Sequence, residues 1–482
     1  MLAMARGASE ISQEDLLELG LQQQATMLAT GAASSRELVE LSLRRIEASQ
    51  PQLNAFRVVC AEQALAAAAA ADRRLAAGNG APLLGVPVAI KDDVDLAGQT
   101  TAFGCGGEHR EAKEDAEVVR RLRAAGAIVV GKTHAPEVGQ WHFTEGSFGV
   151  TRNPWNADHV PGGSSGGAAA AVAARLVAAA VGSDGAGSIR IPAAWTGLVG
   201  LKPQRGRVST WPDPEAFNGL SCYGPLARST GDAALLLDAI QGNVPADLHQ
   251  PTPPGERYAE AAAREPRRLR IALSFATPIG VSAKLDPEHR AAIEAMAERL
   301  AGLGHDVAEE DPDYCLVGPA LVPRGMAGVD GWLRAHVEDR SALEPRTRTH
   351  ARIGGLLDGV PLRLSRAAEP ILQRRVGRIF DRFDLVLTPT TAKPPPRVGA
   401  LADSGYWATS SSASATCPYA FPWNVLGWPA ISIPAGLTSD RLPIGAQLLA
   451  PAEDEATLLS LASSVEQSVG GWPAPDQEAR VA

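Results

Sequence analysis

Three short segments of the chain carry residue types that could perform nucleophilic catalysis. Two serine-containing runs of small residues, 162–167 and 185–188, place hydroxyls on backbone that glycine leaves free to bend. The third segment is the apolar run 83–90, which ends at Lys91. A lysine at the end of a buried strand carries a costly charge, and this favours the neutral amine that acts as a base. One lysine and two serines on tight turns are the parts of a Ser-Lys hydrolase.

Ser188 is the candidate nucleophile, because it follows Gly185, Ala186 and Gly187 and precedes a short predicted helix at 189–192. Successive N–H groups in such a turn can converge on an anion, and the helix dipole adds to this effect. Amide hydrolysis needs such donors where the tetrahedral oxyanion forms. A glycine-rich turn with a serine N-cap would give the same pattern without catalysis.

Ser164 and Ser165 have a structural alternative as well, since either could cap the alanine-rich helix predicted over 166–180. The run 162–166 also matches the G-x-S-x-G pattern of α/β-hydrolases. That fold requires a strand before the serine, whereas 153–161 is turn-like, and it requires an Asp and then a His downstream. No histidine has a distinctive setting, so the pattern does not favour a nucleophile elbow.

Lys91 must lose its proton to act as a base. Its ordinary pKa is about 10.4, and burial can lower that value to about 7–8. The two carboxylates that follow, Asp92 and Asp93, would work against this if they pointed at the amine. We therefore expect both to face elsewhere and to order the loop by accepting backbone N–H bonds.

Composition limits the classes of function. The 482 residues are 45% hydrophobic, which is enough for a sizeable core. The net charge of −9 argues against direct binding of nucleic acid, which needs a basic surface. It suits a protein that acts on small molecules.

The cysteines and histidines predict neither disulfides nor metal binding. Five scattered cysteines without C-x-x-C spacing indicate reduced thiols and a cytoplasmic location. The nine histidines contain no H-x-x-x-H pair, and no phosphate-binding glycine motif occurs in the right context, so we expect neither metal nor cofactor. Residues 1–10 lack a signal-peptide core, and the longest apolar stretch is too short to span a membrane.

Strand and helix patterns alternate along the chain and predict an α/β fold, with a sheet covered by helices on both faces. Predicted strands lie at 86–90, 127–130, 199–202, 269–275, 383–388, 430–434 and 445–449. Predicted helices lie within 11–50 and at 62–77, 117–125, 166–180, 232–240, 286–303 and 455–469. We predict one domain, 1–482, with N-terminal helices at 11–77, a signature core at 83–240, a linker at 243–268, a helical substrate-side region at 313–382, and C-terminal core strands and a helix at 383–470.

Taken together, the three segments resemble the amidase signature family. The resemblance covers roughly residues 12–470 in the same order. The matching segments are 85–92, 162–167 and 183–192, followed by 197–203 and 224–230, and near the C-terminus 421–424 and 427–434.

The resemblance implies a single large α/β/α domain with a mixed sheet of about eleven strands. It implies Ser188 as nucleophile, Ser164 as a relay after a cis Gly163–Ser164 peptide, and Lys91 as the ultimate base. The oxyanion donors would be the N–H groups of residues 185–188. Supporting residues would be Ser165, Asp184 and Arg190, with the last two bracing the loop.

Two residues depart from the family pattern. Ala186 replaces a usual glycine, and its Cβ requires a negative φ or some strain. Asp93 stands where asparagine is common, so it adds negative charge near Lys91 and raises the pKa of that amine.

The predicted activity is hydrolysis of a carboxylic amide to an acid plus ammonia or an amine. An acyl pocket could be lined by Trp195, Cys417, Phe421 and Trp423, although aromatic residues and cysteines also pack cores. One alternative is the glutaminase A-type subunit of a tRNA-dependent amidotransferase, which would need an arginine for the glutamine α-carboxylate. The other is an inactive binding homologue. The expected partner is a small amide, without membrane or direct nucleic-acid binding, and a homodimer is compatible with the resemblance.

Overall fold

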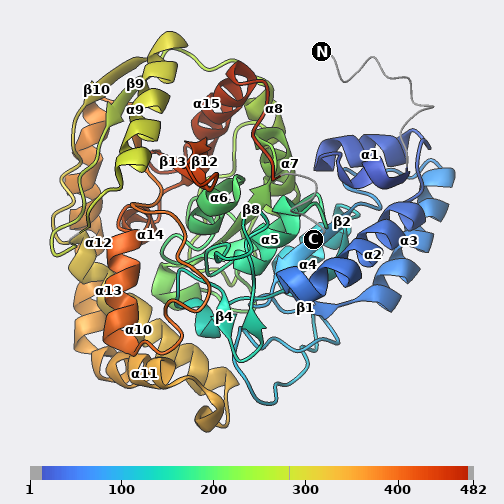
Figure 1. Ribbon diagram of the computed structural model, residues 1–482, viewed down its shortest axis with the longest axis horizontal. Helices are drawn as coiled ribbons and strands as arrows, with labels where there is room; N and C mark the ends of the chain where they lie inside the picture. The colour runs from blue at the N-terminus through green and yellow to red at the C-terminus, as the bar shows by residue number, and fades with distance from the viewer. Residues whose placement is uncertain (1–12, 282, 476–482) are drawn as a thin grey trace.

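The computed structural model describes residues 13–281 and 283–475. Eleven strands form one mixed sheet, which lies among the helices in Figure 1. In spatial order they are β1 (Phe56–Val59), β3 (Ile128–Thr133), β2 (Pro87–Lys91), β6 (Ala179–Asp184), β8 (Cys222–Ala227), β7 (Val199–Lys202), β12 (Ala430–Leu437), β13 (Pro443–Leu449), β11 (Leu385–Pro389), β9 (Arg270–Leu273) and β10 (Asp306–Glu309). The α/β architecture and the size of the sheet are thus confirmed. A separate hairpin joins β4 (Glu145–Gly146) to β5 (Gly149–Val150).

Helices cover both faces of this sheet. The α-helices are α1 (Leu21–Ala29), α2 (Ser35–Leu53), α3 (Ala61–Ala76), α4 (Glu117–Ala124), α5 (Gly166–Ala173), α6 (Arg190–Thr196), α7 (Thr230–Ile240), α8 (Tyr258–Ala263), α9 (Pro287–Gly302), α10 (Val317–His336), α11 (Pro345–Leu357), α12 (Val360–Gly377), α13 (Tyr406–Thr416), α14 (Pro422–Leu426) and α15 (Glu455–Ser468). Short 3-10 helices are η1 (Gln13–Leu17), η2 (Glu137–Gly139), η3 (Ala216–Gly219), η4 (Arg340–Ala342) and η5 (Arg378–Asp381).

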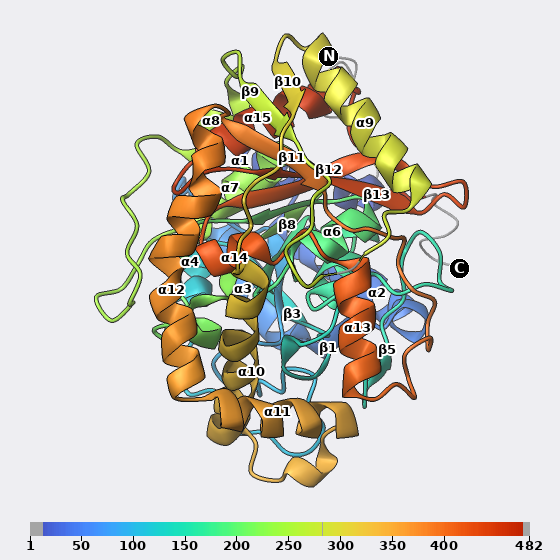
Figure 2. The same ribbon diagram turned by 90° about the vertical axis from the view of Figure 1, so that its left-hand side faces the viewer.

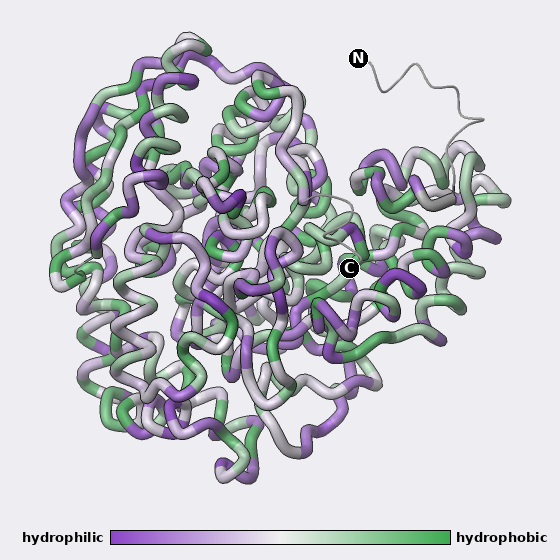
Figure 3. Tube along the Cα trace, in the orientation of Figure 1, coloured by the Kyte–Doolittle hydropathy of each residue, from purple (hydrophilic) through white to green (hydrophobic). Residues whose placement is uncertain are grey.

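The side chains of β2 show how the two layers form. Val88 and Ile90 point into the core that contains α7, α9 and α15, whereas Ala89 points into the core that contains α3 and α5. Successive side chains of a strand face opposite sides of its sheet, so a strand buried on both faces carries apolar residues throughout. At the periphery, hydrophilic and hydrophobic residues alternate along the helices (Figure 3).

The strand order brings two of the predicted catalytic segments to one edge of the sheet. β2 and β6 are parallel neighbours, with Ile90 paired to Val181. Parallel strands end at the same edge, so Lys91 at the end of β2 and the turn after Asp184 at the end of β6 lie close together.

Two predicted segments differ from the structure. The helix predicted over 166–180 ends at Ala173, and residues from Ala179 onward form β6, because an unbroken run of small apolar residues fits a buried strand as well as a helix. The predicted linker 243–268 contains α8, whose Tyr258 is buried against the core. Residues 1–10, whose sequence lacks a signal-peptide core, and the first two positions of the helical segment predicted within 11–50 lie outside the described residues.

The region 313–382 is helical as predicted and supplies α10, α11 and α12. Figure 2 shows these helices with α13 along one side of the sheet. Within 13–281 and 283–475, no helix is long and apolar enough to cross a bilayer.

Candidate active site

A cavity of about 510 Å³ opens where α10 and α13 face the end of β6. Ser164 and Ser188 both line it, together with Gly185 and Ala186. Ser188 is half-buried and Ser164 is buried. The cavity therefore joins the two serine-containing runs that the sequence singled out.

Lys91 lies beneath the cavity and is fully buried. Its Nζ donates to Ser164 Oγ at 2.7 Å and to Ser183 Oγ at 2.8 Å. Burial lowers the pKa of this amine from its ordinary value, against the opposing charge of Asp93. The lysine is thus bonded to one predicted relay residue and to Ser183, to which sequence reasoning gave no role although it lies within the matching segment 183–192.

The two carboxylates after Lys91 behave differently. Asp92 faces away from the amine, pairs with Arg57, and lies 3.2 Å from Lys132 Nζ. Asp93 instead has its Oδ2 3.5 Å from Lys91 Nζ and accepts a hydrogen bond from the Ser183 hydroxyl. The expectation that both carboxylates face elsewhere is therefore wrong for Asp93, because the turn after β2 points its side chain back toward the strand end.

The Gly163–Ser164 peptide is cis, as the resemblance implies. Gly163 has no room for a side chain, since a Cβ there would come within 2.5 Å of the Trp141 carbonyl oxygen. Ser165 does not cap α5 with its side chain. Its hydroxyl donates to the Ser183 carbonyl at 3.1 Å and accepts from the Ser183 N–H at 3.3 Å, so it ties the two serine segments together.

The turn 185–188 is held by Asp184. Its carboxylate accepts the N–H groups of Gly187 at 2.7 Å and Ile189 at 3.2 Å. The N–H groups of Gly185, Ala186 and Ser188 donate to no acceptor among the described residues. Gly187 therefore differs from the expectation that all four residues offer free donors, because its N–H is already engaged.

The conformation of this turn accommodates Ala186. The backbone of Ala186 does not have a positive φ, whereas Gly187 has a φ of 115°. A Cβ on Gly187 would lie 2.6 Å from the Ala420 Cβ. The strained position is thus filled by glycine, and alanine occupies the position that tolerates a side chain.

Arg190 fixes Asp184 from the start of α6. Two guanidinium nitrogens donate to the Asp184 carboxylate, each at 2.9 Å, and both residues are fully buried. Burial opposes ionisation of Asp184, but the charge and hydrogen bonds of Arg190 outweigh it and hold the pKa of Asp184 well below its ordinary value.

Asn424 completes this network, although sequence reasoning gave it no role. Its Oδ1 accepts from Arg190 at 2.6 Å, and its Nδ2 donates to the Asp184 side chain at 2.8 Å and main chain at 2.7 Å. The C-terminal motif 421–424 thereby supports the turn from the far end of the chain. Only the place of Asn424 in a segment that matches the family could have indicated this contact.

One contact of the expected relay is absent. Among the hydrogen bonds of the described residues, none joins the Ser164 and Ser188 side chains. The two segments are nevertheless tied directly, since the Ser165 N–H donates to the Ser188 carbonyl at 3.1 Å. Catalytic hydrogen bonds are often long in a free enzyme and tighten only when substrate is bound.

Comparison with known proteins identifies the family of the chain. The family model described as Amidase matches residues 37–459. The chain belongs to the amidase family. It is 56% identical to the Mycobacterium tuberculosis (strain ATCC 25618 / H37Rv) protein named "Putative amidase AmiA2", over 92% of each chain. It is 48% identical to the protein of the same strain named "Putative amidase AmiB2", over 94% of this chain and 97% of that one.

Proteins with a different named activity are more distant. The glutamyl-tRNA(Gln) amidotransferase of Azotobacter vinelandii (strain DJ / ATCC BAA-1303) has an A-type subunit to which this chain is 40% identical, over 93% of this chain and 97% of that one. The two putative amidases are therefore more similar to this chain than that amidotransferase component is.

Among solved structures, the chain resembles a 6-aminohexanoate cyclic dimer hydrolase complexed with substrate. The TM-score is 0.87 at 32% identity, over 96% of this chain and 99% of that one. It also resembles a peptide amidase in complex with the competitive inhibitor chymostatin, with a TM-score of 0.80 at 27% identity, over 95% and 99%. Membership of the amidase family makes this protein a hydrolase of amide C–N bonds.

The four candidate pocket residues of this amidase separate into two pairs. Cys417 and Phe421 line the cavity. Trp195 and Trp423 do not: both are fully buried, and their indole N–H groups donate to the carbonyls of Lys393 and Ala450. The two tryptophans are core residues, held by hydrogen bonds to distant backbone.

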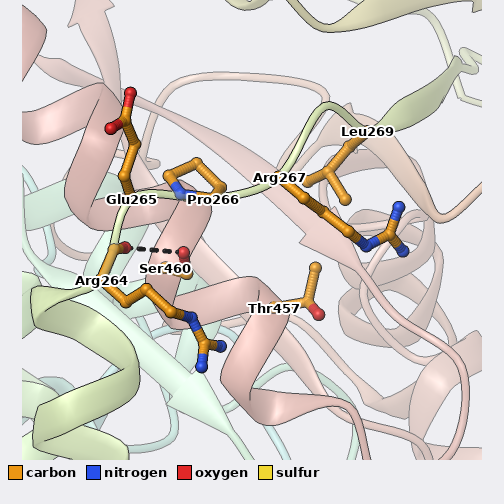
Figure 4. Close-up of a pocket in the computed structure, with 7 residues that line it drawn as sticks. All are labelled: Arg264, Glu265, Pro266, Arg267, Leu269, Thr457 and Ser460. Atoms are coloured by element: carbon orange, nitrogen blue, oxygen red, sulfur yellow. Dashed lines mark hydrogen bonds between the residues drawn. The ribbon is translucent and has the colours of Figure 1, made fainter.

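A second hollow, of about 370 Å³, lies between the chain before β9 and α15 (Figure 4). It is lined by Arg264, Glu265, Pro266, Arg267, Leu269, Thr457 and Ser460. The Ser460 hydroxyl donates to the Arg264 carbonyl, and the Arg267 guanidinium points away from Ser460. Among the described residues, no lysine, arginine or histidine side chain forms a hydrogen bond with Ser460. The second hollow therefore lacks a base beside its serine, whereas Lys91 bonds Ser164 next to the first cavity, so the first cavity is the better candidate for the active site.

Proposed function

We propose that the protein hydrolyses an uncharged carboxylic amide through an acyl-enzyme on Ser188, with Lys91 and Ser164 as the proton relay. The observation that carries the proposal is the fully buried Lys91 amine 2.7 Å from Ser164 Oγ, beneath a cavity that Ser188 lines. A desolvated lysine that bonds a hydroxyl is suited to accept its proton.

The first half-reaction forms the ester. Neutral Lys91 takes the proton of Ser164 while Ser164 takes the proton of Ser188. The Ser188 oxygen then adds to the amide carbon, and the carbonyl oxygen becomes an oxyanion. When this intermediate collapses, the C–N bond breaks, and the relay returns its proton to the leaving nitrogen.

The second half-reaction releases the acid. Water replaces the departed amine and gives a proton to Ser164 and onward to Lys91. The resulting hydroxide adds to the ester carbon, the bond to Ser188 breaks, and the relay reprotonates the Ser188 oxygen. The free enzyme and a carboxylic acid result, and no cofactor takes part.

The oxyanion would be stabilised by the turn after β6. The free N–H groups of Ala186 and Ser188, with that of Gly185, are the proposed donors. Asp184 and Arg190 act as positioning residues. Asp184 accepts the N–H groups of Gly187 and Ile189 and so fixes the direction of the remaining N–H groups, and Arg190 holds the Asp184 carboxylate in place.

The cavity wall supports an uncharged substrate. Among its described lining residues there is no Lys, Arg, Asp or Glu. A site for glutamine would need a cation to balance the α-carboxylate, since burial of an unpaired charge is costly. The glutaminase alternative is therefore less well supported than hydrolysis of a neutral amide.

Compartment and assembly remain predictions. All five cysteines are free thiols, which supports a reducing, cytoplasmic location. A homodimer is compatible with the family resemblance, and light scattering coupled to size-exclusion chromatography measures the assembly directly.

Labelling with a sulfonyl fluoride tests the covalent mechanism. We expect one adduct, which peptide mass spectrometry places on Ser188 and which Ser188→Ala abolishes. With any amide that the enzyme cleaves, added hydroxylamine should capture the acyl group as a hydroxamate. Labelling elsewhere, or cleavage without hydroxamate, would contradict an ester on Ser188. Ser460→Ala is the matched control, since Ser460 lines the second hollow.

A further inference from the structure

One helix contributes a continuous apolar stripe to the wall of the cavity. All residues of α10 that line the cavity are apolar, and they include Gly318, Leu321, Val322, Gly325, Met326 and Val329. Positions 318, 322, 325 and 329 recur at alternating intervals of four and three residues, which is the spacing of a single helical face. Gly318 and Val329 are eleven residues apart, so the stripe is about 16 Å long at a rise of about 1.5 Å per residue.

The stripe runs from the buried interior to the mouth of the cavity. Val329 is 3% exposed, whereas Val322, two turns nearer the start of α10, is 47% exposed. Ile279 also lines the cavity and is 66% exposed, and a Cβ on Gly318 would lie 3.1 Å from the Ile279 carbonyl oxygen. Large apolar side chains that remain in water at the mouth of a cavity are suited to cover an apolar part of a ligand.

The apolar surface also reaches the proposed relay. The Phe103 ring lines the cavity, and its centroid is 5.3 Å from Lys91 Nζ. The centroid of Phe217, which lines the cavity too, is 6.1 Å from that of Phe103. A Cβ on Gly328 of α10 would lie 2.8 Å from Phe217 Cδ1, so Phe217 packs against α10 as well. One apolar wall therefore leads from the relay to the mouth of the cavity.

The second helix in the cavity wall is more polar but uncharged. α13, on the same side of the sheet as α10 (Figure 2), lines the cavity with Tyr406, Ser410, Ala413, Ser414 and Cys417. The Tyr406 hydroxyl donates to Met326 Sδ at 3.7 Å, so α10 and α13 meet at this point of the cavity. The hydroxyls of α13 can bond the polar atoms of an amide group, whereas a chain of carbon atoms is suited to the α10 side.

Gly325 lies within the stripe and leaves space there. Its φ is not in the left-handed region, so the backbone does not require glycine. A Cβ on Gly325 would lie 3.8 Å from Leu220 Cδ1, which is ordinary van der Waals contact, and Leu220 lines the cavity as well. A side chain at this position would therefore project into the cavity. Because glycine is a poor helix former, its presence here is better explained by the open space than by the fold.

We propose that the α10 stripe, which comprises the cavity-lining residues from Gly318 to Val329, binds the extended apolar chain of an uncharged amide, and that Gly325 is a specificity-determining residue that keeps room for this chain. The proposal rests on the proposed function, because it assigns a substrate class to the same cavity. Each methylene that moves from water onto the stripe stabilises the complex, so long chains are favoured, and a side chain on residue 325 removes this advantage.

Two series of amides test the assignment. Acetamide, butanamide, hexanamide and octanamide lengthen the acid part, whereas N-ethyl-, N-butyl- and N-hexylacetamide lengthen the amine part. In wild type we expect kcat/KM to rise by about tenfold or more along at least one series, and the series that shows the rise identifies the part of the substrate that carries the chain. Gly325→Leu should lower the ratio of kcat/KM between the longest and the shortest member of that series by about tenfold or more.

Gly331→Leu is the matched control, because Gly331 lies on α10 but does not line the cavity, and a Cβ there would meet no neighbouring atom within 4 Å. Its chain-length profile should equal that of wild type. If melting curves show that Gly325→Leu does not fold, Gly325→Ala takes its place, with an expected loss of about threefold in the same ratio. The proposal would be overturned by a flat profile of wild type in both series, by an unchanged profile in a folded Gly325 variant, or by an equal loss in Gly331→Leu.

Binding separates this proposal from the catalytic one. Calorimetry with Ser188→Ala, with and without Gly325→Leu, measures the affinity for the same amides without turnover. Tighter binding of the longer amides that Gly325→Leu removes supports the assignment even if no amide in either series is hydrolysed. If affinity does not increase with chain length in either series, the assignment fails, whatever the outcome of labelling at Ser188.

Discussion

The Asp93 carboxylate lies 3.5 Å from Lys91 Nζ and shares Ser183 with it, since the Ser183 hydroxyl accepts from Lys91 and donates to Asp93. The proposed base is therefore buried but has an anion beside it. Burial lowers the pKa of Lys91, and Asp93 raises it. The balance of these two effects sets the pH at which the relay becomes active.

Replacing Asp93 by Asn should shift the pH profile. The charge of Asp93 favours the protonated amine, so its removal lowers the pKa of Lys91, and more neutral base is present at any given pH. The acidic limb of the kcat/KM profile should move to lower pH. Asp95→Asn is the control, because Asp95 bonds Thr101 and not Lys91. A shift to higher pH, or an equal shift in both variants, would argue against Lys91 as the titrating base.

Removal of Lys91 itself should abolish most of the acylation rate. Proton transfer by a positioned base contributes about 10²–10⁴-fold, so Lys91→Met should lower kcat by a factor in this range. Lys91→Arg should be equally slow, because arginine keeps the charge but does not deprotonate. Single-turnover kinetics with melting curves measures both, and surface Lys393→Met is the matched control. A fast Lys91→Arg enzyme would show that charge, and not base catalysis, is what Lys91 supplies.

The sequence predicts the parts of the site better than their contacts. Lys91 could be placed because β2 is a short apolar run that ends in a charge. The orientation of Asp93 could not, since it depends on a turn with no periodicity. Gly187 is engaged because the Asp184 side chain folds under its own turn. That arrangement depends on Arg190, six residues further along the chain, and on Asn424, which comes from a distant segment.

The errors in the fold have similar causes. β6 lies inside an alanine-rich stretch and is buried on both faces, so it shows neither the alternation of a half-buried strand nor a helical stripe. β8 was not predicted either. It contains Pro225, and a proline in a sequence argues against a central strand because it cannot donate a hydrogen bond to the ladder. The ladder between β7 and β8 pairs only Ala227 and Leu226 of β8, which leaves Pro225 without a partner on that side.

Glu137 should make stability depend on pH. Burial raises the pKa of this carboxyl to about 7, although hydrogen bonds from Thr347 and the Glu344 N–H oppose the rise. Its folded pKa exceeds the unfolded one, so its contribution is fully present below pH 4.5 and is lost as pH rises through 7. The loss is on the order of 3 kcal/mol at full ionisation.

Glu137→Gln removes this ionisation while it keeps an acceptor for the Glu344 N–H. The melting temperature of wild type relative to Glu137→Gln should therefore fall between pH 5 and pH 8. Glu298→Gln is the control, since Glu298 is exposed on α9. A difference in melting temperature that is constant with pH would mean that Glu137 stays ionised, or stays neutral, throughout this range.

Loss of Arg190 should damage both stability and activity. Besides Asp184, its guanidinium donates to the Ala420 carbonyl and Gln447 Oε1, each at 2.7 Å. Arg190→Gln leaves the buried Asp184 carboxylate without its counter-ion, and breaking a buried pair from one side costs about 3–5 kcal/mol. We expect a large drop in the free energy of unfolding and a loss of activity, because the turn 185–188 depends on the same carboxylate.

Arg397→Gln is the matched control, since Arg397 pairs with Asp158 at 3.4 Å and both side chains are largely exposed. That variant should lose less than about 1 kcal/mol. Adding Asp184→Asn to Arg190→Gln removes the second charge and should recover part of the stability without recovering activity, because a neutral carboxamide binds the Gly187 and Ile189 N–H groups less strongly than the carboxylate does. Urea denaturation of the single and double variants measures this coupling. If the double variant were destabilised by the sum of the two single effects, the buried pair would not be what Arg190 contributes.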